Sequence, residues 1–349
     1  MNAVLPDFVQ RKQPFSAGQA PELTAMALAG RTLVDCDFSD VVMAGRDLSR
    51  TTFTRCHLAG ADFRGCNLAT TVFHDCDLRA AMFDGVSGND VAFIQTRVSE
   101  ATFAGTRFSR LVMVESDATK TSWRGAQLSD SSFTMSELDG SGFSKATLNN
   151  VALCEVDFST FSGLPATLQK ALLLDCCFDG LDLGQTTFIE TSFNKSRMTG
   201  TRFVGTTLLR SSLMDCDLVG VDFAGARIEQ CLFLKSRIRR CRFDGATTTS
   251  LNFDGATCEE LHFAGNDLSG SRWTEALIEG STFDDCEFGL ADLSNARIVN
   301  TRFIACALTR ASWHNARIED SRFTRCKQPR VVTQPERLAA EAAFIREFV

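Results

Sequence analysis

An apolar residue recurs at every fifth position of the chain from Leu23 to Phe323, with few exceptions. The numbers of these positions end in 3 or 8, as in the run Leu48, Phe53, Leu58, Phe63, Leu68, Phe73. This period excludes α-helix and ordinary β-strand as its cause, since their side-chain periods are about 3.6 and 2 residues. A small residue usually lies two positions before each apolar centre, and a turn-tolerant residue often lies two positions after it. Each five-residue unit is therefore predicted to form one side of a coil.

The pattern of aromatic residues predicts four sides per coil. Centres whose numbers end in 3 are mostly Phe, with Trp123, Trp273 and Trp313, whereas centres ending in 8 are mostly Leu, Ile or Met. If four units make one coil, the aromatic sides face each other and the aliphatic sides face each other. Every layer of the core then has a similar volume, which close packing requires.

Three units show the repeat clearly: residues 61–65 read ADFRG, residues 66–70 read CNLAT, and residues 216–220 read CDLVG. They closely resemble the pentapeptide repeat family, whose consensus is A-(D/N)-L-x-x, and the resemblance covers roughly residues 21–326. It implies an all-β fold, a right-handed quadrilateral parallel β-helix of about 15 coils. The matched motif is structural, so the resemblance carries over no functional residue.

The chain is predicted to contain five segments: an N-terminal segment (1–20), the first half of the β-helix (21–160), a break (161–174), the second half of the β-helix (175–326), and a linker with a C-terminal helix (327–349). In the break, Phe161 occupies a small position and Gly163 a centre, while residues 166–174 have a helix-like composition. We predict a bulge or a short helical break there.

A short C-terminal α-helix is predicted from a capping box formed by Thr333 and Glu336. Its apolar stripe, which caps the open end of the solenoid or mediates dimerisation, consists of Leu338, Ala342, Ile345, Phe348 and Val349.

The cysteines and histidines do not indicate a catalytic or metal site. Eleven of the 14 cysteines occupy small inward positions, which predicts packing roles and free thiols. Two thiol ladders, Cys36–Cys56–Cys76 and Cys286–Cys306–Cys326, lack C-x-x-C spacing and a histidine partner, so no metal and no cofactor is expected. The four histidines, His57, His74, His262 and His314, are predicted to be isolated and outward-facing. With no phosphate loop or nucleophile motif, the chain is predicted not to be an enzyme.

One side of the predicted coil carries an uncharged outer surface. The columns before and after its centres contain no Lys, Arg, Asp or Glu until Asp254 and Arg272, although 23% of the chain is charged. Such a strip marks an interface or a covered surface. Three occupants stay open: the chain's own N-terminal segment or C-terminal helix, a second copy, or a foreign protein. The predicted binding surface comprises Val72, Ile94, Val112, Val114, Leu172, Leu174, Met214, Leu232 and Leu234.

These features favour a non-catalytic, rod-shaped module for protein–protein interaction. By analogy with long family members, it is expected to be an adaptor, scaffold or accessory protein, for example of a bacterial secretion system such as type VI. The alternative is a DNA-mimicking modulator of DNA gyrase or topoisomerase IV, as in quinolone-resistance members of the family. A net charge of only -7, and arginines within the column that contains Asp37, Asp77, Asp117 and Asp157, count against mimicry.

Neither direct nucleic-acid binding nor a membrane span is expected. The first twenty residues contain no apolar run of signal-peptide length. The expected location is the cytoplasm, with export by a signal-independent secretion system as the alternative.

Overall fold

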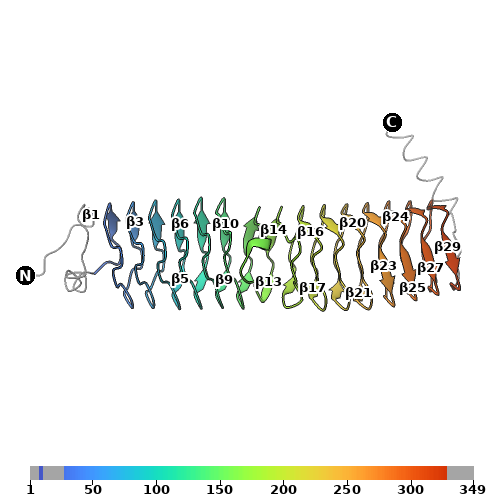
Figure 1. Cartoon of the computed structure of the whole chain (residues 1–349), viewed down its shortest axis with the longest axis horizontal. Coiled ribbons are helices and arrows are strands. Elements are labelled where there is room, and N and C mark those ends of the chain that lie inside the picture. Colours follow the sequence, from blue (N-terminus) through green and yellow to red (C-terminus); the bar gives the residue numbers. More distant parts are fainter. Residues whose placement is uncertain (1–7, 11–26, 328–349) are drawn as a thin grey trace, which may run out of the picture. The chain divides into compact units, whose positions relative to one another are not determined.

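The computed structural model describes residues 8–10 and 27–327, and the chain divides into two compact units, Met1–Cys176 (unit 1) and Cys177–Val349 (unit 2). Each unit is a stack of short parallel strands (Figure 1). A residue in one coil pairs with the residue 20 positions later, as Phe53 pairs with Phe73 and Phe263 with Phe283. The fold is an all-β parallel β-solenoid of about 15 turns, which confirms the predicted fold class.

The described residues of unit 1 form two sheets and one short 3-10 helix. The first sheet consists of β1 (Phe8–Gln10), β2 (Thr32–Val34), β3 (Thr52–Thr54), β4 (Val72–His74), β6 (Ala92–Ile94), β8 (Val112–Val114), β10 (Ser132–Thr134), β12 (Ala152–Cys154) and β14 (Leu172–Leu174). The second consists of β5 (Ser87–Asn89), β7 (Arg107–Ser109), β9 (Gln127–Ser129), β11 (Thr147–Asn149) and β13 (Thr167–Gln169). The 3-10 helix is η2 (Phe158–Thr160). The other two sides of each coil pair through isolated bridges, such as Asp62↔Met82.

Unit 2 contains strands on three sides of its coils. One side has β15 (Thr187–Ile189), β17 (Thr207–Leu209), β19 (Arg227–Glu229) and β21 (Thr247–Thr249). A second has β16 (Arg197–Thr199), β18 (Asp217–Val219), β20 (Arg237–Arg239), β22 (Thr257–Glu259), β24 (Leu277–Glu279), β26 (Arg297–Val299) and β28 (Arg317–Glu319). The third has β23 (His262–Ala264), β25 (Thr282–Asp284), β27 (Arg302–Ile304) and β29 (Arg322–Thr324).

The core of each coil is filled by the apolar centres. Phe53 stacks on Phe73 of the next coil with 5.0 Å between ring centroids, and Phe63 stacks on Phe83 at 4.7 Å. Across one coil, Phe53 and Phe63 meet edge to face at 6.5 Å. The predicted opposition of aromatic sides is therefore confirmed. Each fully buried ring contributes about 2 kcal/mol of hydrophobic stabilisation, before the entropy of ordering is subtracted.

The corners between sides contain residues with left-handed backbone. Arg55 has φ of 51° and Gly60 has φ of 68°. A residue with a side chain pays about 1–2 kcal/mol for this conformation. The ladder of hydrogen bonds offsets the cost, because the corner N–H of Arg55 donates to the carbonyl of His74 one coil further on, at 3.0 Å.

The predicted break differs from the rest of unit 1 in its register. Asp157 caps η2 by accepting from the N–H of Ser159 at 2.9 Å, and Gly142 then pairs with Gly163, 21 positions later. The interval returns to 20 at Thr147 and Thr167. The break is thus a 3-10 turn with a one-residue bulge.

Residues 167–174 form strands, not a helix. Leu172–Leu174 pairs residue by residue with Ala152–Cys154. Their helix-like composition is overridden because the edge of the preceding coil offers partners to every backbone group, and tertiary pairing outweighs local propensity.

Only part of the predicted terminal segments is described. Phe8–Gln10 forms a strand at the edge of the first sheet, where Val9 pairs with Leu33. The backbone of this tripeptide therefore extends the solenoid by one strand. The predicted C-terminal helix, including Leu338, Ala342, Ile345, Phe348 and Val349, lies outside the described residues.

Candidate interaction surface

The first sheet of unit 1 presents an outer surface without charge, here called the uncharged face. Because side chains alternate along a strand, the central residue of each three-residue strand points into the core and its two neighbours point outward. The outward positions of this face are Thr32, Val34, Thr52, Thr54, Val72, His74, Ala92, Ile94, Val112, Val114, Ser132, Thr134, Ala152, Cys154, Leu172 and Leu174. Of these residues, Val34 is buried. None of these sixteen is Lys, Arg, Asp or Glu, as the column analysis predicted.

Apolar side chains on this face form two clusters instead of one continuous strip. Parallel pairing places Val72, Ala92 and Val112 in one row and Ile94 beside Val114 in the other. A second cluster of Ala152, Cys154, Leu172 and Leu174 lies on β12 and β14. β10 separates the clusters with two hydroxyl side chains, Ser132 and Thr134. The predicted binding surface is therefore not one continuous apolar strip.

Two residues stand out by exposure within the clusters. Val112 is 38% exposed and Leu172 is 41% exposed, which is high for large aliphatic side chains. Val72, Ile94, Val114 and Leu174 are half-buried by their neighbours. A partner would gain most by covering Val112 and Leu172, since burial of exposed apolar area drives association.

Met135 is an apolar residue that the column analysis missed. It follows β10 at a corner and is 71% exposed. Its backbone has φ of 49°, an unfavourable conformation for a residue with a side chain. The column analysis considered only positions next to the centres, so a corner residue was not compared. The sequence does contain a signal for Met135, because it is an apolar residue in a row of corner positions that are otherwise mostly polar.

Polar and charged corner residues border the uncharged face on both sides. Arg55 binds Asp35 with 2.8 Å between Nε and Oδ1, and Gln95 donates to Glu115 at 2.8 Å. On the other edge, Arg110 binds Asp90 with 2.6 Å between Nε and Oδ1. An apolar centre with a polar rim is the usual layout of a protein interface.

Unit 2 contains the remaining predicted surface residues on the corresponding side of its coils. Leu232 is 38% exposed, while Met214 and Leu234 are half-buried. The outward columns on this side contain no charged residue until Asp254 and Arg272, which form an ion pair of 2.8 Å.

The acidic residues Asp77, Asp117 and Asp157, which lie in one outward column of unit 1, accept hydrogen bonds from side chains or backbone groups of the same protein. The carboxylate of Asp77 accepts two bonds of 2.8 Å from Arg79 and lies 3.3 Å from Arg97. The bonds from Arg79 hold the pKa of Asp77 below its usual value. Asp117 and Asp157 accept hydrogen bonds from the residues two positions later, Thr119 and Ser159. These carboxylates are less available to imitate a row of phosphates.

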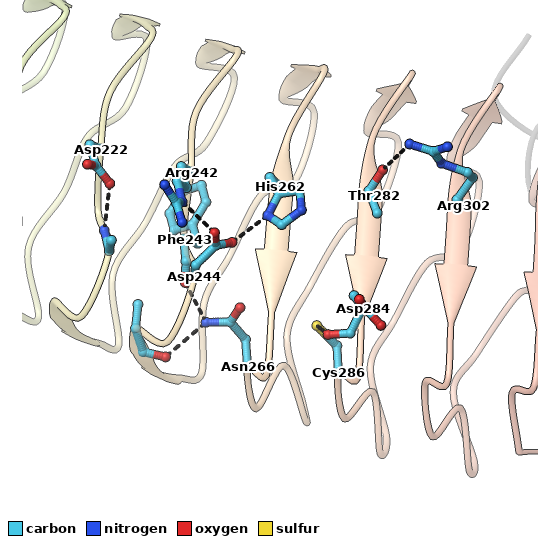
Figure 2. Close-up of polar contacts among 12 residues, drawn as sticks. Asp222, Arg242, Phe243, Asp244, His262, Asn266, Thr282, Asp284, Cys286 and Arg302 are labelled. Atoms are coloured by element: carbon cyan, nitrogen blue, oxygen red, sulfur yellow. Dashed lines mark hydrogen bonds and ion pairs between the residues drawn. The ribbon is translucent and has the colours of Figure 1, made fainter.

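The histidines occupy three kinds of environment. His57 is exposed and His74 half-buried. Figure 2 shows His262 of β23 hydrogen-bonded to Asp244, which also binds Arg242. The prediction that His314 faces outward is wrong, because its side chain is fully buried. Its position after the centre Trp313 had predicted exposure.

All 14 cysteines are free thiols. Of the eleven at small inward positions, all but Cys326 are buried. Burial raises the pKa of Cys216 and Cys231 to about 12, so both are protonated at neutral pH. No group of three or more His, Cys, Asp or Glu residues with metal-site geometry occurs in residues 27–327.

Comparison with known proteins supports the repeat assignment. Two family models match the chain: one described as "Pentapeptide repeat region" at residues 186–263, and one described as "Pentapeptide repeats (8 copies)" at residues 32–68 and 286–325. The chain is a pentapeptide repeat protein. Members of this class are generally structural or interaction modules without enzymatic activity.

Solved structures of similar chains include QnrB1, described as a plasmid-mediated fluoroquinolone resistance protein. It is 18% identical over 63% of this pentapeptide repeat protein and 83% of the QnrB1 chain, with a TM-score of 0.23. HetL from the cyanobacterium Nostoc sp. strain PCC 7120, described as involved in heterocyst differentiation regulation, is 18% identical over 74% of this chain and 87% of its own, with a TM-score of 0.21. A search of curated protein sequences gives no match. None of the helices in residues 27–327 is long and apolar enough to cross a membrane.

Proposed function

We propose that this pentapeptide repeat protein is a non-catalytic adaptor or scaffold that binds a protein partner along the uncharged face of unit 1. The observation that carries the proposal is the absence of charge from all sixteen outward residues of β2, β3, β4, β6, β8, β10, β12 and β14, combined with exposed Val112 and Leu172. Solvated surfaces usually carry charge, and an uncharged sheet surface with a charged rim favours burial against another protein.

The rigidity of the solenoid supports this role. The strands of the face from β2 to β12 are each held by parallel pairing on both sides, as β8 is held between β6 and β10, and β14 pairs with β12. The face therefore needs little ordering when it binds, which lowers the entropic cost of association. The finer form of the proposal is that the partner belongs to a bacterial secretion system, such as type VI.

Affinity purification of the full chain from native lysate, followed by mass spectrometry, tests the proposal. A variant carrying Val112→Glu and Leu172→Glu places a charge in each apolar cluster. We expect it to lose a partner that the wild type captures, because burying an unpaired carboxylate costs several kcal/mol. Secretion components among the lost proteins would support the finer form.

Val42→Glu is the matched control. Val42 is 67% exposed in unit 1, on a different side of the coil. The control should keep every partner, and circular dichroism should show that all variants remain folded. Retention of all partners by the Val112→Glu, Leu172→Glu variant would contradict the proposal. So would an equal loss in the Val42→Glu variant.

The same variants distinguish the other occupants. If the wild type is a dimer by light scattering and the double variant is a monomer, the face joins two copies of the chain. If wild type and double variant inhibit DNA gyrase equally, and Asp117→Lys with Asp157→Lys abolishes inhibition, DNA mimicry replaces the adaptor proposal.

A further inference from the structure

A second surface of unit 1, on the outer side of β5, β7, β9 and β11, is hollowed into a groove. The groove is open to solvent, has a volume of about 670 Å³ and is lined by residues between Asn67 and Asn149. This volume is within the range of small-molecule and cofactor sites, about 300–1,000 Å³.

Gly88 explains why the wall is hollowed there. Position 88 is a centre that the repeat usually fills with a large aliphatic residue, and a Cβ added to Gly88 would lie only 2.7 Å from Cγ2 of Val91. β5 therefore lies closer to the core than a Leu would allow. The hydrogen bond from Leu68 N–H to the carbonyl of Ser87 is correspondingly long, 3.5 Å.

The groove is lined by amide and hydroxyl side chains. Those from successive strands are Ser87 and Asn89, Ser109, Gln127 and Ser129, and Thr147 and Asn149, and Arg107 is the one charged residue among the lining residues. The side chains of Asn89, Arg107, Gln127 and Asn149 make no hydrogen bond or ion pair within the described part of the chain. Their donors and acceptors are free for a ligand.

This chemistry restricts the class of ligand. A nucleic acid strand would require several cations, whereas the groove offers only Arg107. A peptide would require exposed apolar pockets for its side chains, but Phe108 and Leu128 in the lining are 2% and 1% exposed. Amides and hydroxyls both donate and accept hydrogen bonds, as sugar hydroxyls do. Their recurrence on adjacent strands, spaced about 4.8 Å apart, suits a linear chain with one sugar ring per strand.

We propose that this groove binds a linear oligosaccharide of neutral sugars, with the side-chain amides of Asn89, Gln127 and Asn149 hydrogen-bonded to hydroxyl groups of the rings that lie over β5, β9 and β11. Arg107 donates further hydrogen bonds from the middle of the groove. Each hydrogen bond contributes only about 0.5–1.5 kcal/mol net, so binding depends on the number of rings in contact. The site lies on a different side of the coil from the uncharged face, and it does not depend on the proposed adaptor function.

Isothermal titration of the full chain with maltohexaose and with cellohexaose tests this proposal. We expect at least one hexasaccharide to bind at millimolar concentration. The corresponding disaccharide should bind at least about tenfold more weakly. Gln127→Ala with Asn149→Ala should weaken hexasaccharide binding by about tenfold, through the loss of two or more hydrogen bonds. Gln185→Ala, an exposed amide in unit 2, should leave binding unchanged.

Three results would overturn the proposal. The first is that neither hexasaccharide binds at millimolar concentration. The second is that binding survives Gln127→Ala with Asn149→Ala at full strength, which would place the sugar elsewhere. The third is that an acidic oligosaccharide binds far more tightly than both neutral ones, with binding abolished by Arg107→Gln and by salt, which would assign the groove to anions.

Discussion

The ring of Phe161 stacks on the ring of Phe143 with 5.4 Å between the centroids and 15° between the planes. Phe161 lies two positions before the centre that the period assigns to this layer, and that centre is Gly163. The 3-10 turn η2 and the bulge after it bring Phe161 into the aromatic stack. The stack therefore extends into the irregular coil, although the repeat itself is interrupted there.

Phe161→Ala should destabilise unit 1 by about 2 kcal/mol. The ring is half-buried, so the cost is expected to be below the usual 3–5 kcal/mol for a fully buried Phe→Ala change. Chemical denaturation of the full chain measures the free energy of unfolding. Phe161→Leu, which retains part of the packing, should cost less, and equal effects of the two changes would contradict a packing role.

Thr121→Val should cost about 2 kcal/mol, because it leaves a buried donor without its acceptor. Nε1 of Trp123 donates to Oγ1 of Thr121 at 2.9 Å, and both side chains are buried. Thr121 also bonds to Ala118 and Ser141, so a double-mutant cycle with Trp123→Phe is needed. In the Trp123→Phe background the cost should be smaller. The same cost in both backgrounds would show that the indole bond contributes nothing.

Alkaline pH should lower the free energy of unfolding, because the protein contains buried thiols. Burial raises the pKa of Cys176, Cys216 and Cys231 to about 12, above the ordinary value of 9.0. As pH rises, the thiols of the unfolded chain lose their protons before those of the folded protein, and this favours unfolding. The contribution of the thiols to the free energy of unfolding is therefore fully present below pH 9 and is lost as pH rises toward 12. Near pH 10 the loss is roughly 1 kcal/mol per thiol.

Cys216→Ala tests this dependence. The variant should lose less free energy of unfolding between neutral pH and about pH 10 than the wild type does, by roughly one thiol's contribution. An identical pH dependence in both proteins would exclude Cys216 as a source of the alkaline loss.

Asp77→Asn should destabilise unit 1 by about 1 kcal/mol and reduce its sensitivity to acid. Hydrogen bonds from Arg79 lower the pKa of Asp77, so the stability is present above the ordinary carboxyl value of 3.8 and is lost as pH falls through the lowered folded-state value. Unfolding measured from neutral pH to about pH 3 should show a smaller loss in the variant. Asp90→Asn, at an exposed ion pair with Arg110, should change little.

Met135→Glu should weaken partner capture without reducing stability. The side chain is 71% exposed beside the uncharged face, so the change removes apolar contact area but no core packing. Pull-down of the partner defined with the wild type measures the effect. Full retention of that partner would show that the interface ends before the corner.

The core of this protein was predictable because burial of a residue depends on its position within its own five-residue unit. A residue such as Phe63 is buried because it is a centre in a five-residue unit, and the same unit recurs along the chain. The uncharged face followed from the same periodicity, since outward residues are the neighbours of centres. The groove was not predicted, because it depends on how far β5 moves inward when Gly88 replaces a large centre.

The sequence by itself determined the coil, its four-sided core and the column without charge, since each depends only on a residue's place within a regular repeat. The tertiary structure decided the exceptions. Leu172 became a strand residue because β12 supplied backbone partners, and Phe161 entered the aromatic stack because the bulge shifted the register. His314 is buried despite its outward position in the repeat. In each case the side chain's environment depends on a neighbouring coil or on chain distant in sequence, and a pattern of five residues does not contain that information.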